Sequence, residues 1–299
     1  MRNSFINKLF EYFKSTDDFY FLTADLGFSV LEIIRDKFPK NFLNVGICEQ
    51  NMSLLSVGMS ENTNVVYNYS IAPFLTLKSF EIYRNYYNRD NRNIKIIAVG
   101  SAFSYGQMGF THHILEDVAM MSLLENFYIC NPSSSKELDY IYKLQKSLQS
   151  PFYIRLSKEN YFPPKDYKFK NLGSVFYKRG KKINIISSGS VLKYIISSLP
   201  ESKSFFINHI SLPELNHFNE KVVLDKLINK NTLIVFDFYL ASKKINSLIN
   251  KIKIKFPYKK IEILDLNQNK EYRVGNNDFI LEQFGINKEN ISQIIRQLI

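Results

Sequence analysis

Short apolar runs alternate with amphipathic segments along this chain, and that alternation limits its fold more than any other feature. Phe19–Thr23, Ile94–Val99 and Phe152–Leu156 are short and rich in β-branched and aromatic residues, as buried strands are. Segments with helical spacing separate them, such as Glu49–Met59. Strands that alternate with helices at this spacing predict a parallel sheet with helices on both faces.

The alternation pauses once and then resumes. Residues 159–170 hold Pro163 and Pro164 among charged side chains, which predicts a linker. Further apolar runs predict strands at residues 183–187, 204–207, 233–236 and 261–264. We therefore expect an α/β protein with two parallel-sheet domains, residues 1–160 and 173–299, joined by a linker at 161–172.

The net charge of +11 raises the question of a nucleic-acid partner. The lysines, however, are spread over the whole chain, and Lys, Asn, Ile, Phe and Tyr are all abundant. This pattern indicates a general compositional bias and not one basic face, so we expect no nucleic-acid partner. An anionic substrate or an acidic partner protein is compatible with the charge.

The sequence also bears on the compartment. No apolar run reaches the roughly 20 residues that a membrane span needs, and the N-terminus lacks the apolar segment of a signal peptide. Cys48 and Cys130 lie far apart in apolar surroundings, which predicts buried free thiols and neither a disulfide nor a metal site. We expect a cytoplasmic protein with no membrane contact and no metal ligands of its own.

Glu49 is the first candidate for chemistry. It lies in the segment N-V-G-I-C-E-Q-N-M, at the predicted start of a helix and among apolar residues. A carboxyl group in such a place loses hydration, so its neutral form is favoured and it can share a proton with a bound ring nitrogen. The alternative is a helix N-terminal acid that only complements the helix dipole.

Asp25 and His112 are two further candidates. Asp25 follows the run Phe19–Thr23, at the end of a predicted strand, where ligands meet open α/β sheets. A turn or capping acid is the alternative. His112 and its neighbour follow a glycine-containing loop at 100–109, and a loop histidine beside a ligand can transfer protons. The alternative is an ordinary surface histidine.

Three segments together resemble a known family. V-G-I-x-E-Q-N-M at 45–52 is preceded by A-D-L at 24–26 and followed by T-H-H-x-L-E-D at 111–117. This combination resembles the pyrimidine-binding domain of transketolases, and more specifically the separately encoded C-terminal subunit of a split transketolase. The resemblance is dense over residues 23–158 and thin from residue 173 onward. It implies an enzyme that uses thiamine diphosphate to transfer a two-carbon ketol unit between sugars.

The resemblance assigns roles to single residues. It implies that Glu49 protonates the cofactor pyrimidine, that Phe74 stacks on this ring, and that His112 contacts the donor substrate. Without the resemblance, Phe74 would be one core phenylalanine among 25. The resemblance further implies that Asp25 and Ser29 line the cofactor and substrate channel, and that Ile47 packs near the pyrimidine. It gives no role to His113, and it suggests capping and packing for Glu116 and Asp117.

The sequence departs from the family in its missing metal motif. No G-D-G with a downstream asparagine occurs, although this motif supplies the Mg²⁺ and diphosphate site in the family. The resemblance therefore implies a partner, an N-terminal transketolase-like subunit that holds the diphosphate and Mg²⁺. The cofactor would lie between the chains of a heterotetramer built on a homodimer.

The substrate positions also differ. Met108 replaces an aspartate that contacts a sugar hydroxyl in ordinary transketolases, Gly100 replaces a phosphate-binding histidine, and Lys158 replaces an arginine. Met108 and Lys158 thus suggest a specialised sugar or sugar phosphate. Three alternatives remain: the β subunit of a 2-oxoacid dehydrogenase, a deoxyxylulose-phosphate-synthase-like protein, or a non-catalytic assembly subunit.

Overall fold

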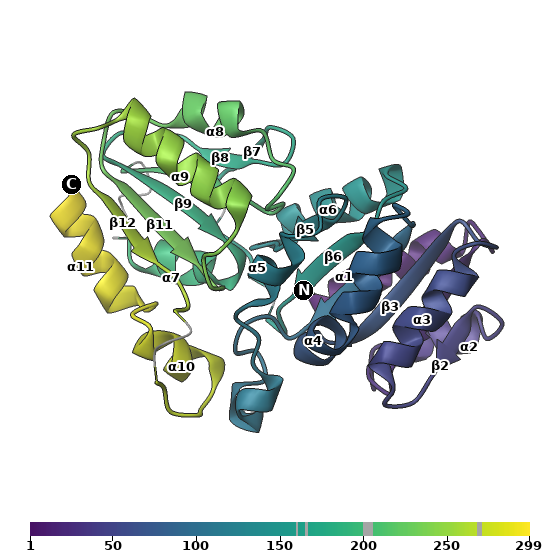
Figure 1. Ribbon diagram of the computed structural model, residues 1–299. Helices are drawn as coiled ribbons and strands as arrows, with labels where there is room; N and C mark the ends of the chain where they lie inside the picture. The colour runs from purple at the N-terminus through teal and green to yellow at the C-terminus, as the bar shows by residue number, and fades with distance from the viewer. Residues whose placement is uncertain (160, 165–166, 200–205, 268–270) are drawn as a thin grey trace.

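The computed structural model describes residues 1–159, 161–164, 167–199, 206–267 and 271–299. Two six-stranded sheets, each covered by helices, lie side by side (Figure 1). The first sheet has the order β2-β1-β3-β4-β6-β5, and every pair in it is parallel. Its strands are β1 Phe19–Thr23, β2 Phe42–Asn44, β3 Val65–Ile71, β4 Ile94–Val99, β5 Tyr128–Cys130 and β6 Phe152–Leu156.

Helices cover both faces of the first sheet, as the alternation predicted. One face packs against α3, α4 and α5 through Met52, Leu75 and Val118, and the other packs against α1, α2 and α6. The helices are α1 Arg2–Phe13, α2 Glu32–Lys37, α3 Glu49–Met59, α4 Ala72–Ile82, α5 Asp117–Met121 and α6 Ser135–Ser147. Residues Tyr83–Asn88, directly after α4, form a π-helix.

The second sheet has the order β12-β11-β9-β10-β8-β7. Its strands are β7 Lys170–Asn171, β8 Phe176–Lys178, β9 Ile183–Ser188, β10 Ile207–Ser211, β11 Thr232–Phe236 and β12 Ile261–Leu264. The α/β class is confirmed, but this sheet is not wholly parallel. β8 runs antiparallel to β10, and β7 runs antiparallel to β8. A tight turn through Gly173, with a φ of 77°, joins β7 to β8 as a hairpin.

Five helices accompany the second sheet in the described part of the chain: α7 Leu192–Ser197, α8 Glu220–Lys226, α9 Lys243–Lys255, α10 Asn277–Gln283 and α11 Lys288–Leu298. The strand expected at 204–207 is β10, which begins at Ile207; residues 204 and 205 lie outside the described residues. The proposed linker at 161–172 already includes β7. The division of the chain into two domains at that point stays a prediction.

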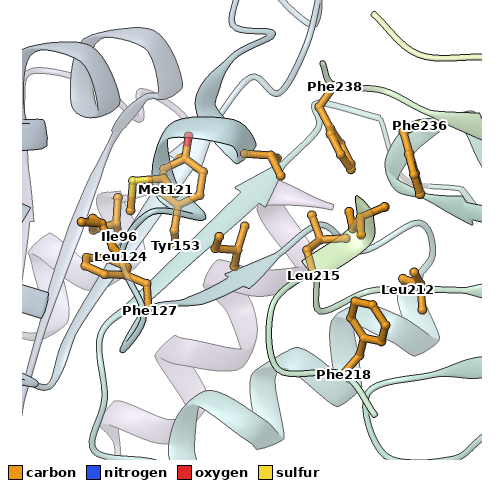
Figure 2. Close-up of a cluster of buried hydrophobic side chains, with 14 of the residues drawn as sticks. Ile96, Met121, Leu124, Phe127, Tyr153, Leu212, Leu215, Phe218, Phe236 and Phe238 are labelled. Carbon is orange, nitrogen blue, oxygen red and sulfur yellow. The ribbon is translucent and has the colours of Figure 1, made fainter. Parts of the chain in front are cut away.

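The two sheets are joined by backbone pairing and by a shared apolar core. In the loop after β10, Pro213 accepts a hydrogen bond from the backbone N–H of Asn131 at 2.8 Å, and Leu215 donates one to Ile129 at 2.9 Å. This loop therefore continues the first sheet beyond β5. Figure 2 shows a single cluster of buried apolar side chains that extends from Phe127 of the first half to Leu215 and Phe218 of the second. The loop after β10 thus covers β5, an edge strand of the first sheet.

The structure can be compared with the expected burial of both cysteines and with the expected lack of a membrane span. Cys130 is buried as predicted, but Cys48 is exposed, because it lies in the loop that precedes α3; neither forms a disulfide. Within the described ranges, no helix combines the length and the apolar composition needed to cross a bilayer.

Candidate active site

The predicted site residues gather at one edge of the first sheet. Asp25 follows β1, Glu49 follows β2, Phe74 follows β3, His112 follows β4 and Lys158 follows β6. Because these strands are parallel, their carboxyl ends meet at the same edge, which is where open α/β sheets bind ligands. The topology therefore brings five segments, far apart in sequence, to one side of the molecule.

Glu49 is the first residue of α3, and its side chain is only 2% exposed. The expected burial is present, but its source is different. The neighbour Ile47 is 74% exposed, so it does not cover the carboxyl group. Helix α4 packs against the start of α3 here: the hydroxyl of Ser79 donates a 3.3 Å hydrogen bond to the backbone carbonyl of Glu49, which also accepts one from Ser53 of α3 at 3.0 Å.

Lys78 of α4 is the partner of this carboxyl group. Its Nζ lies 3.1 Å from Oε2 of Glu49, and its side chain is half exposed. The same nitrogen lies 5.0 Å from the centroid of the Phe74 ring. Lys78 was not among the residues predicted from the sequence, although a signal was present: it follows Phe74 by four residues, a spacing that places both on one helix face.

Phe74 and His112 complete the group. Phe74 is half-buried in the first turn of α4, and its ring centroid lies 5.1 Å from that of His112, at an interplanar angle of 73°. His112 ends a short 3₁₀ turn, and its Nδ1 lies 3.1 Å from the hydroxyl of Thr111. We refer to Glu49, Phe74, Lys78 and His112 as the active-site cluster, since each of them contacts another member.

A cavity of about 460 Å³ adjoins the cluster. It is lined by Pro73, Phe74, Leu77, Lys78, Phe110, Thr111, His113, Leu115, Glu116 and Tyr272. A mostly apolar cavity with a few polar groups is typical of a small-molecule or cofactor site. Phe74 and Lys78 line this cavity, and Lys78 also contacts the buried carboxyl group of Glu49, so an aromatic face and a carboxyl group lie on either side of one lysine.

The second histidine has a different environment. His113 is buried, its Nδ1 lies 2.9 Å from the hydroxyl of Tyr272, and its Nε2 lies 3.0 Å from the carbonyl of Gly106. Burial lowers the pKa of His113, which favours a neutral ring. This side chain fixes the loop after β4 to the C-terminal segment, so the adjacent histidines have separate contacts.

Asp25 and Ser29 lie in a strained loop. Their φ angles are 49° and 63°, in the left-handed region that residues other than glycine seldom adopt. Asn44 holds the loop: its Oδ1 accepts 3.0 Å hydrogen bonds from the backbone N–H groups of Asp25 and Gly46, and its Nδ2 donates to Oδ1 of Asp25 at 3.1 Å. Such strain is frequent at functional sites. Asp25 lines a small cleft of about 80 Å³ beside α2, apart from the cavity at Phe74.

Met108 and Lys158 line a different cavity, of about 380 Å³. Met108 is 58% exposed, and Nζ of Lys158 lies 3.9 Å from the centroid of the Tyr105 ring. Partial burial and the charge of Arg2 lower the pKa of Lys158. Asn276, from the second half of the chain, also lines this cavity. Two of the four predicted substrate residues, Met108 and Lys158, therefore line one cavity. Tyr105 of this cavity lies between Lys158 and the active-site cluster, with its ring centroid 6.4 Å from that of His112.

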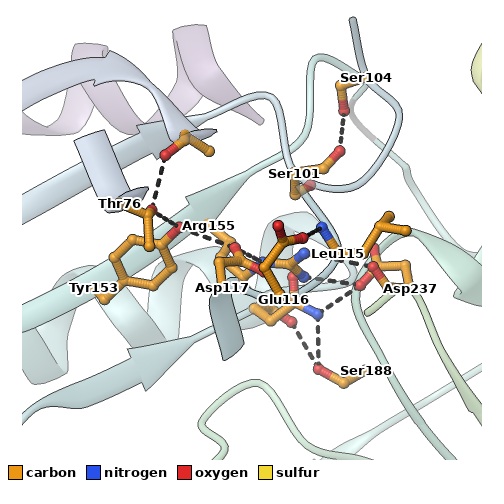
Figure 3. A network of polar contacts seen from close by, with 12 residues as sticks. Thr76, Ser101, Ser104, Leu115, Glu116, Asp117, Tyr153, Arg155, Ser188 and Asp237 are labelled. Carbon is orange, nitrogen blue, oxygen red and sulfur yellow. Dashed lines mark hydrogen bonds and ion pairs between the residues drawn. The ribbon is translucent and has the colours of Figure 1, made fainter. Parts of the chain in front are cut away.

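A buried polar network connects the site to the second sheet (Figure 3). Arg155 of β6 is fully buried, and it pairs with Asp117 at 2.7 Å and with Asp237 at 3.0 Å. The hydroxyl of Tyr153 donates to Asp117 at 2.9 Å and lies 2.7 Å from that of Thr76 in α4. Burial raises the pKa of Asp117, and the Arg155 guanidinium acts in the opposite direction. The sequence analysis missed this network, which reaches the helix that holds Phe74 and Lys78.

Asp237, which follows β11 of the second sheet, is held by several hydrogen bonds. Its Oδ2 accepts hydrogen bonds from the backbone N–H of Ser190 at 2.7 Å and from the Ser190 hydroxyl at 2.8 Å. Gly189, with a φ of 80°, leaves the necessary room, because a Cβ atom there would lie 2.3 Å from Asp237. Asn131 donates to Oδ1 of Asp237 at 2.8 Å.

Large apolar side chains remain exposed around the site. They come from the loops and helices at the same edge: Phe28, Ile47, Leu77, Met108 and Phe110. Exposed apolar groups around a site are typical of a surface that binds a ligand or another protein. In the part of the chain that the structure describes, no group of three or more His, Cys, Asp or Glu side chains could hold a metal ion.

The fold and the site define the class first: an α/β protein whose ligand site lies at the open carboxyl edge of a parallel sheet. Comparison with known families then gives the family. Residues 1–164, more than half of the 299, match the pyrimidine-binding domain of transketolase, so the chain belongs to this family.

Individual relatives agree with this assignment. The chain is 27% identical over 161 residues to a putative transketolase C-terminal section of Methanocaldococcus jannaschii, a match covering 54% of this chain and 51% of that protein. It is 24% identical over 220 residues to a subunit of the apulose-4-phosphate transketolase of Actinobacillus succinogenes, covering 72% and 71%. A solved structure titled split gene transketolase, inactive beta4 tetramer, superimposes with a TM-score of 0.80 at 20% identity, covering 99% of this chain and 97% of that one.

Proposed function

We propose that this chain is the C-terminal subunit of a cytoplasmic split transketolase, which uses thiamine diphosphate to transfer a two-carbon ketol unit between sugars. The observation that supports this most is the position of Glu49. Its carboxyl group is 2% exposed at the ligand edge of the sheet, and the Lys78 that pairs with it also contacts the Phe74 ring. A buried acid beside an aromatic face suits an aminopyrimidine.

The bound cofactor would supply a nucleophilic carbon for attack on the ketose carbonyl. Glu49 would hold a proton at the pyrimidine ring nitrogen, because a buried carboxyl group can exchange one with a ring held against it. Phe74 would stack on the face of that ring, a contact worth about 0.5–1.5 kcal/mol beyond burial. His112, whose ring touches Phe74, would move a proton at an oxygen of the donor sugar.

Other residues would shape the substrate path. Asp25, Ser29 and Ile47 would line the approach to the cofactor, and Met108 and Lys158 would contact the sugar or its phosphate. Lys158 offers one positive charge without the fork of an arginine. Met108 cannot accept a hydrogen bond from a sugar hydroxyl as an aspartate does, so we propose a less hydroxylated or differently configured sugar.

A second polypeptide is part of the proposal. The sequence lacks the G-D-G motif for Mg²⁺ and diphosphate, and apolar side chains such as Ile47 and Phe110 are exposed at the site. We infer that an N-terminal transketolase-like subunit holds the metal and diphosphate, and that the two chains form a heterotetramer on a homodimer. A neighbouring reading frame with G-D-G and a downstream asparagine would be the partner to test.

Reconstitution tests the function. The chain, the candidate partner and the mixture are titrated with thiamine diphosphate and Mg²⁺ by calorimetry, and the mixture is assayed with ketose donors and with pyruvate. We expect tight binding by the mixture only, together with ketose turnover. Turnover of pyruvate alone would favour a 2-oxoacid dehydrogenase or deoxyxylulose-phosphate-synthase type. Absence of cofactor binding by every pair would refute the proposal, and full turnover by Glu49→Ala would favour a non-catalytic assembly role.

A further inference from the structure

Lys78, the cation beside Glu49, lies where a bound cofactor would need to be. We propose that the ammonium group of Lys78 occupies, in the free chain, the place that the N–H of an aminopyrimidine takes, and that it must leave before the ring can enter. This inference rests on the proposed function and adds a residue to it. Lys78 is a positioning residue for Glu49 in the free chain and a competitor of the cofactor.

Two contacts support this assignment. Nζ of Lys78 lies 3.1 Å from Oε2 of Glu49, where it acts as a hydrogen-bond donor to a carboxylate. It also lies over the Phe74 ring, 5.0 Å from the centroid. A bound aminopyrimidine would need the same two partners, the carboxyl oxygen for its N–H and the aromatic face for its ring. One position cannot hold both groups.

The burial of Glu49 explains why a substitute donor is needed. Its side chain is 2% exposed, and a buried carboxylate without a donor is strongly disfavoured. Lys78 meets that need while no ring is bound. Binding then exchanges one N–H donor for another, and Glu49 is not left without a partner.

Lys78 is also able to leave. Its side chain is 52% exposed and lines the cavity of about 460 Å³ together with Phe74. A long, half-exposed lysine can turn its charged end to water while its stem stays in place. The N–H of the incoming ring then replaces the ammonium group at the Glu49 carboxyl group, so the buried acid keeps a donor.

Amine labelling tests the displacement directly. The assembled complex is treated with acetic anhydride with and without thiamine diphosphate and Mg²⁺, and acetylation of each lysine is followed by mass spectrometry. We expect several-fold faster labelling of Lys78 when the cofactor is bound, and no change at Lys253, an exposed lysine of α9. Unchanged or slower labelling of Lys78, with calorimetry showing bound cofactor, would overturn the inference. If no cofactor binds, the proposed function itself fails.

A double-mutant cycle tests the competition. Lys78→Met keeps the apolar stem and removes the charge, so it should tighten thiamine diphosphate binding by about three- to fivefold, the effect of one half-exposed ion pair. Lys78→Arg keeps a positive charge and should bind the cofactor with wild-type affinity. Lys253→Met, the control, should leave the affinity unchanged. The gain should vanish in a Glu49→Gln background, because a neutral amide does not hold the ammonium. Weaker binding by Lys78→Met would show that Lys78 helps to hold the cofactor, contrary to this inference.

Discussion

The two sheets of this protein differ most at their carboxyl edges. At the edge of the first sheet, Asp25 and Ser29 are exposed in strained backbone, and Ile47 is 74% exposed. At the edge of the second sheet, Ser188 and Asp237 are fully buried and hydrogen-bonded. The first edge is open, and the second is closed by the body of the first half of the chain.

Whether the carboxyl edge of an α/β sheet can bind a ligand therefore depends on what covers that edge. Both edges place polar side chains after buried strands. In the second sheet these side chains bond to Arg155, Asn131 and Ser190, so they hold the structure together. In the first sheet, Glu49 has a half-exposed lysine as its charged partner, so its carboxyl group is available to a ligand.

The largest expected effect is at the open edge. Glu49→Ala should lower ketol transfer by the assembled complex by about 10²–10⁴-fold, the usual loss for a group that handles a proton. The urea midpoint of the chain should change little, since Lys78 can turn to water. Glu81→Ala, an exposed acid of α4, is the matched control and should retain activity. A large loss of stability in Glu49→Ala would show that Glu49 holds the structure together, as the polar side chains of the second edge do, and would contradict the contrast between the two edges.

The closed edge should show the reverse behaviour. Arg155→Met should lower the free energy of unfolding by about 3–5 kcal/mol, because it leaves Asp117 and Asp237 buried without their cation. Urea unfolding followed by circular dichroism measures this change. Replacing both acids with Asn in the same variant should recover part of the loss. Wild-type stability in Arg155→Met would mean that the apolar core alone holds this edge.

A smaller effect concerns pH. Burial raises the pKa of Glu214, in the loop after β10, from 4.5 to about 7. The folded chain thus binds this proton more tightly than the unfolded chain, so the contribution to stability is full below about pH 4.5 and is lost as pH rises through about 7. Over this pH range, the free energy of unfolding should fall by about 3 kcal/mol. Urea unfolding at pH 5 and pH 8 should show a smaller difference between the two pH values for Glu214→Gln than for the wild type, and an equal difference would contradict this assignment.

The smallest effect should come from the aromatic face. Phe74→Leu keeps an apolar side chain but removes stacking, so thiamine diphosphate affinity should fall by about two- to tenfold, given about 0.5–1.5 kcal/mol for such a contact. Calorimetry on the assembled complex measures it. Phe162→Leu, at an exposed phenylalanine that does not line the cavity at Phe74, is the control. Equal affinities of the Phe74 variant and the control would argue against stacking.

The sequence predicted the buried strands best. β1, β4 and β6 begin and end at the predicted residues, because a run of apolar residues records burial directly. It failed for the hairpin of β7 and β8: β7 consists of two exposed polar residues, Lys170 and Asn171, which have no apolar pattern. Helix α10 was missed as well.

The roles of the site residues stay a prediction, and the contacts among them could not be predicted from the sequence. The sequence pointed to Glu49 as a buried acid, yet Lys78, its partner, lies 29 residues away on another helix. Arg155 pairs with acids that are 38 and 82 residues away. Such pairs depend on how helices pack against sheets, and local patterns contain no information on that.

The loop that continues the first sheet beyond β5 makes each half of the polypeptide depend on the other. Pro213 and Leu215 supply backbone partners to Asn131 and Ile129, which either half alone would lack. A protease nick between residues 161 and 169 should leave two fragments. They should stay associated through this backbone pairing and through the buried ion pair of Arg155 with Asp237. Fragments made separately should fold poorly alone and recover their structure on mixing, as complementing pieces do.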